Sequence, residues 1–294
     1  MEQCKVPEKE ILLFVSDMDG TLLREDFTIS PGNLAAIRQL EPAGIRFAVA
    51  TGRTYYDAKM ICAKHGLNPY IISNNGACVF HPDGTLLFGR KLDKSFVSET
   101  VNYLEQEAIC YGLGESEGYI APKNWMEVFD KEVARLRTEG MDIPEEKAEF
   151  AKQETQAQHG VRIVENMQEY LKQGDAVYSI SLITYDEAVL RRVRGWMSGY
   201  QGPAVCISGT HNAEIMFQDC TKGRTLELLC QHLKISAGQA AVAGDSLNDL
   251  DMFERTGLGF AMGNARKEIK DAADVVTKPG KEDGVAEAIG YLLG

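Results

Sequence analysis

The sequence predicts an α/β fold, with a Rossmann-like core on a parallel sheet and an inserted α+β domain. Two observations support this prediction. Short apolar runs alternate with helical patterns in the first and last thirds of the 294 residues, as in a parallel sheet covered by helices. In the middle third, apolar runs instead flank short turns, as in β-hairpins. We therefore expect a discontinuous core of residues 1–85 and 216–294, and an insertion of residues 86–215.

The first third follows the order strand, helix, strand, helix, strand. The apolar run at 11–15 predicts a buried strand, and Ser30-Pro31 predicts a helix start, because proline fits the first helical position. Gly44 predicts the end of that helix, since glycine readily adopts the left-handed conformation that follows a helix. The next three elements are a strand at 45–50, a helix at 54–65 and a strand at 70–73.

The middle third predicts hairpins and helices. Residues 81–84, His-Pro-Asp-Gly, lie between two apolar runs and predict a turn. An amphipathic pattern predicts a helix at 94–109, whereas the polar stretch 121–172 predicts helices joined by loops. Alternating or short apolar runs predict strands at 178–184, 204–208 and 213–217, the last two joined by a turn at 209–212.

The last third returns to alternating strands and helices, each strand being a short apolar run before an amphipathic stretch. The predicted strands lie at 239–243, 258–262 and 275–277. The predicted helices lie at 222–233, 247–256, 265–272 and from 283 onward.

Composition excludes several classes of protein. The net charge of −12 argues against nucleic acid or an anionic membrane as the partner. Seven cysteines without a Cys-x-x-Cys pair predict reduced thiols rather than a disulfide framework or a zinc site. The N-terminus is polar, and the apolar run at 11–15 is too short for a signal peptide or a membrane span. We expect a cytoplasmic protein that is a monomer or a weak homo-oligomer.

Asp17 and Asp19 follow the first buried strand directly, within the segment Asp-Met-Asp-Gly-Thr. In extended backbone, residues two apart point to the same side, so both carboxylates should leave the strand end together. Ligands bind at the strand ends of parallel sheets, and paired carboxylates favour a shared proton or a bound cation. Taken alone, such a segment is in most cases a turn that carries solvated acids.

Asp245, Asn248 and Asp249 follow the predicted strand at 239–243. Their spacing of three and four residues places them together at the start of a helix. Carboxylates so placed suit Mg²⁺, which keeps several waters and needs few protein ligands. Simple capping of the helix start is the alternative explanation.

Two further segments provide groups that suit an anion. Thr51-Gly52-Arg53 follows the second strand with a hydroxyl and backbone N–H groups, which suit a phosphate oxygen. Lys222 opens a helix and brings positive charge there. An ordinary N-cap threonine and a solvated lysine are the alternatives for each segment alone.

Together, the four segments resemble the haloacid dehalogenase superfamily of phosphotransferases. Asp17 to Thr21 match its first motif, Thr51 its second, Lys222 its third and Gly244 to Asp249 its fourth. The finer pattern is similar to the Cof-type branch. The segments that carry this similarity are Thr51-Gly52-Arg53, Asn75-Gly76-Ala77, Lys222-Gly223, Met262-Gly263-Asn264-Ala265 and Asp283-Gly284-Val285-Ala286.

The resemblance implies a Mg²⁺-dependent phosphatase that acts on a small phosphorylated metabolite, such as a sugar phosphate, through an aspartyl-phosphate. Asp17 would be the nucleophile and Asp19 the general acid and base. Mg²⁺ would bind Asp17, Asp245 and the backbone carbonyl of Asp19, with support from Asp249. The residues implied in binding phosphate or substrate are Thr51, Gly52, Arg53, Asn75, Lys222 and Asn248, the last orienting Lys222 or the phosphate.

The insertion at 86–215 would be the α+β cap domain of this branch, which closes over the site and recognises the leaving group. Two other functions stay open at this point. A phosphosugar mutase would use the same Asp17 and Asp19 but return the phosphate to its substrate. A phospho-accepting signalling receiver also combines acids, a hydroxyl and a lysine, but it is a single domain of about 120 residues.

Overall fold

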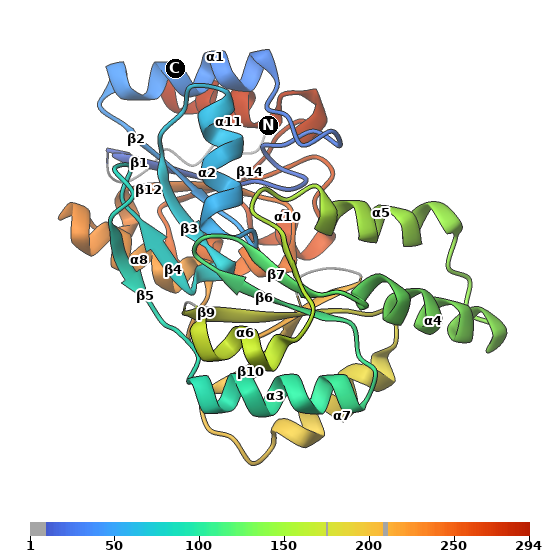
Figure 1. Ribbon diagram of the computed structural model, residues 1–294. Coiled ribbons are helices and arrows are strands. Elements are labelled where there is room, and N and C mark those ends of the chain that lie inside the picture. The colour runs from blue at the N-terminus through green and yellow to red at the C-terminus, as the bar shows by residue number, and fades with distance from the viewer. Residues whose placement is uncertain (1–9, 175, 208–210) are drawn as a thin grey trace. The chain divides into compact units, whose positions relative to one another are not determined.

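The computed structural model describes residues 10–174, 176–207 and 211–294 (Figure 1). The polar N-terminus and residues 209 and 210 of the turn predicted at 209–212 therefore lie outside the described residues. The chain forms two compact units. The first comprises the described residues up to Gly52, Ala58–Gly89 and Cys220–Gly294, and the second comprises Arg53–Asp57 and Arg90–Asp219. The crossings before Arg90 and after Asp219 lie a few residues beyond the predicted boundaries, whereas Arg53–Asp57 lie inside the predicted core and belong to the second unit.

The first unit contains an eight-stranded sheet in the order β14-β13-β12-β1-β2-β3-β4-β5. Its strands are parallel except for β4 and β5, which add antiparallel to the edge. The strands are β1 (Leu13–Asp17), β2 (Arg46–Ala50), β3 (Tyr70–Ser73), β4 (Cys78–Phe80), β5 (Leu86–Gly89), β12 (Ala240–Gly244), β13 (Leu258–Ala261) and β14 (Val275–Val276). The predicted α/β fold with a parallel sheet is confirmed.

The strand order reverses between β1 and β12, which lie side by side in parallel. Chain segments that follow these two strands therefore leave the same edge of the sheet in opposite directions. Ligands bind at such a reversal in open α/β sheets. The two acidic segments of the sequence follow these two strands.

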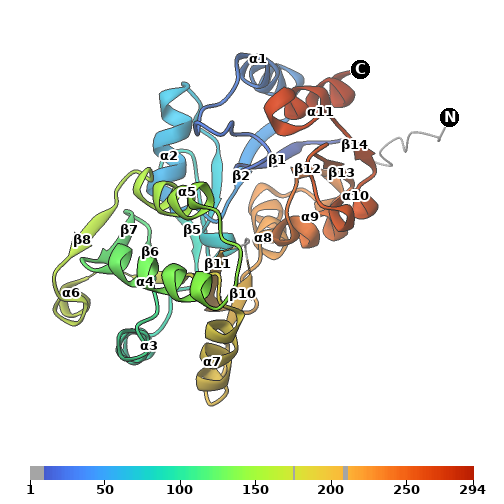
Figure 2. The ribbon, with the colours of Figure 1, turned by 90° about the vertical axis from the view of Figure 1, so that its right-hand side faces the viewer.

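Helices cover both faces of this sheet, as Figure 2 shows for α1 and α11 on one side and α8 and α9 on the other. Leu13 and Val15 of β1 pack with residues of α8, α9 and α10, whereas Phe14 points to the opposite face and contacts Phe47 and Phe260. The helices are α1 (Pro31–Leu40), α2 (Tyr55–Lys64), α8 (Lys222–Leu233), α9 (Leu250–Arg255), α10 (Lys267–Ala272) and α11 (Gly284–Leu293).

The predicted start of α1 and the late Asp283-Gly284 segment belong to one structural connection. Ser30 caps α1 by accepting a hydrogen bond from the N–H of Asn33 (3.0 Å). Its hydroxyl also contacts the Asp283 carboxylate, which joins α1 to the start of α11. A side chain at Gly284 would collide with the carbonyl of Lys278. This segment therefore contributes to the packing of α1 against α11.

The second unit contains a six-stranded sheet in the order β10-β11-β9-β6-β7-β8, in which only the pair β7 and β8 is parallel. Its strands are β6 (Tyr111–Glu115), β7 (Tyr119–Pro122), β8 (Arg162–Val164), β9 (Val177–Ile183), β10 (Pro203–Ile207) and β11 (Asn212–Phe217). Its helices are α3 (Lys94–Gln106), α4 (Trp125–Thr138), α5 (Glu145–Gln156), α6 (Met167–Gln173) and α7 (Glu187–Met197). Helices α3, α6 and α7 pack on one face of the sheet, and α4 and α5 on the other.

Three short strands of this unit were not predicted. β6 precedes the stretch 121–172, for which helices and loops were predicted, whereas β7 spans the start of that stretch and β8 lies within it. Two of the three residues of β8 are exposed, so β8 has no apolar alternation. Its pairing with β7 at the edge of the sheet defines it.

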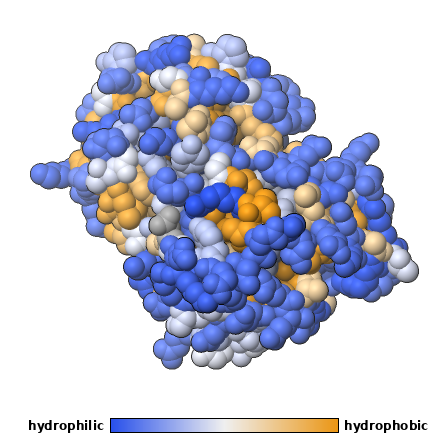
Figure 3. Space-filling view, in the orientation of Figure 1, coloured by the Kyte–Doolittle hydropathy of each residue, from blue (hydrophilic) through white to orange (hydrophobic). Residues whose placement is uncertain are grey.

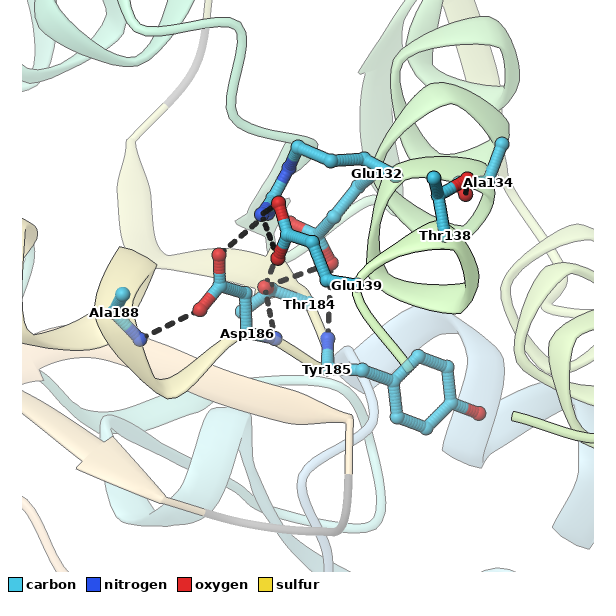
Figure 4. Close-up of polar contacts among 9 residues, drawn as sticks. Glu132, Ala134, Thr138, Glu139, Thr184, Tyr185, Asp186 and Ala188 are labelled. Atoms are coloured by element: carbon cyan, nitrogen blue, oxygen red, sulfur yellow. Dashed lines mark hydrogen bonds and ion pairs between the residues drawn. The ribbon is translucent and has the colours of Figure 1, made fainter. Parts of the chain in front are cut away.

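Charged residues of the second unit hold α4 against the turn after β9 (Figure 4). The Glu132 carboxylate accepts hydrogen bonds from the Thr184 hydroxyl (2.8 Å) and the Tyr185 N–H (3.0 Å). Asp186 caps α7 through the N–H of Ala188 (2.7 Å) and pairs with Arg135 (2.5 Å). Each of these carboxylates has a partner within the unit, so the cluster is structural.

Hydrophilic residues cover most of the face shown in Figure 3. Large apolar side chains that are exposed, such as Leu86, Phe150 and Val276, come from different elements. Within the described ranges, every helix is too short or too polar to cross a membrane.

Candidate active site

Three carboxylates meet where β1 and β12 end. Asp17 is the last residue of β1, and Asp245 and Asp249 lie in the loop after β12. Each offers an oxygen atom within 4.8 Å of the other two. Asp17 and Asp249 are buried, so their mutual repulsion is poorly screened by water. A nearby cation or a shared proton would relieve this repulsion.

Lys222 provides one such cation from the first turn of α8. Its ammonium group lies 2.7 Å from Oδ1 of Asp17 and 2.7 Å from Oδ1 of Asp249. Burial of this lysine would by itself lower its pKa, but the two carboxylates outweigh that effect and raise the pKa above its ordinary value. Lys222 is only 1% exposed, so the solvated-lysine alternative is wrong.

Asp17 has one oxygen bound and one oxygen free. Oδ1 accepts from Lys222, whereas the buried Oδ2 has no hydrogen-bond partner among the described residues. Burial and the neighbouring Asp249 raise the pKa of Asp17, and Lys222 offsets part of this rise. Burial, followed by Asp249, also raises the pKa of Asp245 to about 6. An unpaired buried oxygen beside two more carboxylates fits a hard divalent cation.

The loop after β12 is built around Asp249. Its Oδ2 accepts hydrogen bonds from the N–H groups of Asp245 (3.0 Å) and Ser246 (3.0 Å). The predicted helix at 247–256 therefore begins as a 3₁₀ turn over Leu247–Asp249, and α9 follows it. The capping explanation holds for one oxygen of Asp249, and the other oxygen binds Lys222. A role for Asp249 toward a metal stays a prediction.

The loop after β1 turns sharply at Gly20, which has a φ of +80°. A side chain there would collide with the Asp245 carboxylate, so glycine lets the two acidic segments approach each other. The Thr21 hydroxyl donates to Oδ1 of Asp245 (3.4 Å). Met18 is fully buried and Asp19 is half-buried. The shared orientation of Asp17 and Asp19 stays a prediction.

The segment after β2 lies against the turn after β3. Thr51 is buried, and its carbonyl accepts from the N–H of Asn75 (3.0 Å). A side chain at Gly52 would lie 3.1 Å from the Asn75 amide, so glycine keeps this approach open. The Asn248 amide donates to Oδ1 of Asn75 (3.0 Å). Asn75 thus connects Thr51 of the second motif with Asn248 of the fourth. A role for Asn248 toward phosphate stays a prediction.

Arg53 belongs to the second unit, together with the start of α2. Its guanidinium pairs with the buried Asp57 at 2.6 Å. A role for Arg53 toward substrate stays a prediction.

Asn264 also takes part in this site, although the sequence offered no role for it. Its amide N–H groups donate to the Gly20 carbonyl (2.9 Å) and to Oδ2 of Asp245 (3.0 Å). A polar residue at the carboxyl end of β13, on the same sheet edge as Asp17 and Asp245, was the available signal.

The comparisons with known proteins identify the family. A model of the haloacid dehalogenase-like hydrolases matches residues 14–289. The chain belongs to this family. It is 32% identical over 286 residues to phosphatase YwpJ of Bacillus subtilis (strain 168), which covers 96% of this chain and 99% of that protein.

Two further similarities agree with this identification. The chain is 31% identical over 286 residues to 5-amino-6-(5-phospho-D-ribitylamino)uracil phosphatase YwtE of B. subtilis (strain 168), over 94% of this chain and 96% of that one. A solved haloacid dehalogenase-like hydrolase from B. subtilis is 31% identical, with a TM-score of 0.80 over 96% of this chain and 100% of that one. The Cof-type resemblance is confirmed, and this haloacid dehalogenase-like hydrolase is a phosphatase.

Proposed function

We propose that this phosphatase hydrolyses a small phosphate monoester through an aspartyl-phosphate formed on Asp17. One observation carries the proposal. Asp17 is buried at the end of a central strand, with Oδ1 bound by Lys222 and Oδ2 without a partner. A carboxylate needs no base to remove a proton before it attacks phosphorus.

The reaction has two displacements. An oxygen of Asp17 bonds to phosphorus while the ester P–O bond breaks, and Asp19 gives its proton to the departing oxygen. Water then gives a proton to Asp19 and bonds to phosphorus, while the bond between phosphorus and Asp17 breaks. The alcohol and inorganic phosphate are released, and both carboxyl groups return to their starting states.

Mg²⁺ is the proposed cofactor, held by Asp17, Asp245 and the backbone carbonyl of Asp19, with Asp249 in support. When bound, it would neutralise charge so that an anionic ester can approach an anionic nucleophile. The close approach of the three carboxylates and the unpaired Asp17 oxygen support this assignment.

The phosphoryl oxygens would be held by the Lys222 ammonium, the Thr51 hydroxyl and the backbone at Gly52. Asn75 and Asn248 form an amide pair beside Gly52 and are proposed to contact phosphate or substrate. Arg53 is proposed to contact the substrate. Catalysis of phosphoryl transfer consists mainly of such positioning and charge neutralisation.

The substrate is proposed to be a small phosphorylated metabolite, such as a sugar phosphate. The name of the relative YwtE specifies a phosphorylated ribityl compound, which supports this class. We further propose that residues 1–85 and 216–294 act as the hydrolase core and that residues 86–215 act as a cap that recognises the leaving group. The insertion contains none of the proposed catalytic groups.

The proposal is tested by trapping the intermediate with Asp19→Asn. Because p-nitrophenol leaves without protonation, this variant should still transfer the phosphoryl group of p-nitrophenyl phosphate to Asp17. Without a base for water, it should then stall and release one molar equivalent of p-nitrophenol. Peptide mass spectrometry should find the phosphoryl group on Asp17, and no adduct in the double variant with Asp17→Asn. Phosphorylation of another residue would refute the mechanism.

A product assay separates the phosphatase from a phosphosugar mutase. Hydrolysis releases one inorganic phosphate for each substrate consumed, whereas a mutase yields an isomerised sugar phosphate. We expect free phosphate, in agreement with the phosphatases to which the chain is similar. A panel of sugar phosphates and nucleotides, each scored for both products, makes the comparison.

A further inference from the structure

Asn264 joins three segments of the first unit. One N–H of its amide donates to the Gly20 carbonyl (2.9 Å), and the amide also donates to Oδ2 of Asp245 (3.0 Å). Its oxygen accepts from the N–H of Gly280 (2.9 Å). The three partners come from the loop after β1, the loop after β12 and the loop before α11. One side chain thus links these three loops to one another.

The backbone around Asn264 is itself anchored to the end of β12. The N–H of Met262 donates to the Gly244 carbonyl (3.1 Å), and the N–H of Arg266 donates to the Asp245 carbonyl (3.2 Å). Asn264 lies between these two anchors. Its amide is therefore presented to Asp245 from a fixed backbone, which reduces the entropy lost when the carboxylate is oriented.

The polarity of the contacts requires a donor at this position. The Gly20 carbonyl and the Asp245 carboxylate are both acceptors, so they cannot bind each other. An amide NH₂ group provides a donor to both while its oxygen serves Gly280. Gly280 in turn packs so closely on the Gly20–Thr21 backbone that a side chain there would lie 2.5 Å from the Thr21 carbonyl.

We propose that Asn264 is a positioning residue, which holds the Asp245 carboxylate and the Asp19–Gly20 turn at the spacing that a bound Mg²⁺ requires. This inference rests on the metal site of the proposed function. Removing a group that orients a metal ligand typically lowers the metal affinity by about 10- to 100-fold. Because Asn264 is exposed, water can replace its hydrogen bonds, so its loss should affect orientation more than folding.

The test measures Mg²⁺ binding directly, by isothermal titration calorimetry on the full chain without substrate. Asn264→Leu keeps most of the side-chain volume and removes every side-chain hydrogen bond. Asn264→Ala is a second variant that controls for a steric effect of leucine. The control is Asn166→Ala, because Asn166 is also exposed and accepts a local hydrogen bond from the N–H of Glu169 (3.0 Å) in the second unit. Thermal unfolding in chelator reports on the fold of each variant.

We expect the Mg²⁺ dissociation constant to rise about 10-fold in both Asn264 variants and to stay unchanged in Asn166→Ala. At saturating Mg²⁺, the KM of both variants for p-nitrophenyl phosphate should lie near the parent value. Unchanged Mg²⁺ affinity in either folded variant would overturn the positioning role and leave the proposed function intact. A parent protein that binds no Mg²⁺ would instead overturn the metal assignment, and this inference with it.

Discussion

Replacing Lys222 with methionine tests the electrostatics of the site. Methionine keeps an unbranched apolar side chain and removes the ammonium group. Lys222 lies 2.7 Å from one oxygen of Asp17 and 2.7 Å from one oxygen of Asp249, and its side chain is 1% exposed. The two carboxylates are 6% and 0% exposed, so water cannot take the place of the lost cation.

The expected loss of stability follows from this burial. Removing one partner of a buried ion pair costs about 3–5 kcal/mol, because the remaining charge is left uncompensated. Here one cation serves two buried carboxylates, so we expect a loss at the upper end of that range. The deficit should shrink as pH falls, since a carboxyl group whose pKa is already raised, such as Asp17, takes up a proton more easily. Added Mg²⁺ should also reduce the deficit.

Urea unfolding in chelator, at neutral and at mildly acidic pH, measures these effects. The matched control is Lys131→Met, which removes an ion pair of the same 2.7 Å length to Glu127. Those two side chains are 74% and 66% exposed, so their loss should change stability little. If Lys222→Met loses no more stability than Lys131→Met, burial does not control the strength of this ion pair and the reasoning fails.

Three further predictions concern the nucleophile, the metal and pH. Asp17→Asn should abolish phosphate release while urea unfolding stays cooperative, because an amide is a poor nucleophile; turnover near the parent rate would refute the mechanism. Asp245→Ala should raise the Mg²⁺ concentration for half-maximal phosphate release, and full activity in chelator would exclude the metal. Burial and the charge of Lys64 lower the pKa of His65, whose Nε2 accepts from the N–H of Ile29 (3.3 Å). The histidine therefore stabilises the fold above about pH 6.5 and loses this contribution as pH falls through its lowered pKa. In urea unfolding, His65→Gln should remove this pH dependence; an identical pH profile would contradict the assignment.

The sequence alone predicted the elements of the parallel sheet and the positions of the acidic segments. Residues 11–15 and 239–243 were predicted as strands, and in the structure β1 and β12 overlap them but begin and end one or two residues later. A strand that is buried on both faces of a parallel sheet needs a continuous apolar run, so it can be predicted from a short stretch of sequence. Short edge strands escaped prediction because pairing with a neighbour defines them, as β8 illustrates.

The contacts among the site residues depended on the tertiary structure. The sequence placed Asp17, Lys222 and Asp249 in separate motifs, but only the fold shows that one ammonium group bridges both carboxylates. It also shows that the Asn248 amide binds Asn75, 173 residues away. Such contacts depend on which strands become neighbours, and strand order follows from the packing of the whole sheet rather than from any short segment.

Asn264 is a further residue whose contacts only the tertiary structure shows. The sequence showed it as part of a segment shared with the Cof-type branch, without a function. Its hydrogen bonds reach Gly20, 244 residues earlier, and Asp245, 19 residues earlier. Residue type and local pattern therefore determined which chemical groups reach the edge of the sheet. The order and close packing of the strands decided which of those groups lie within hydrogen-bonding distance, because that distance is set by neighbours far apart in the chain.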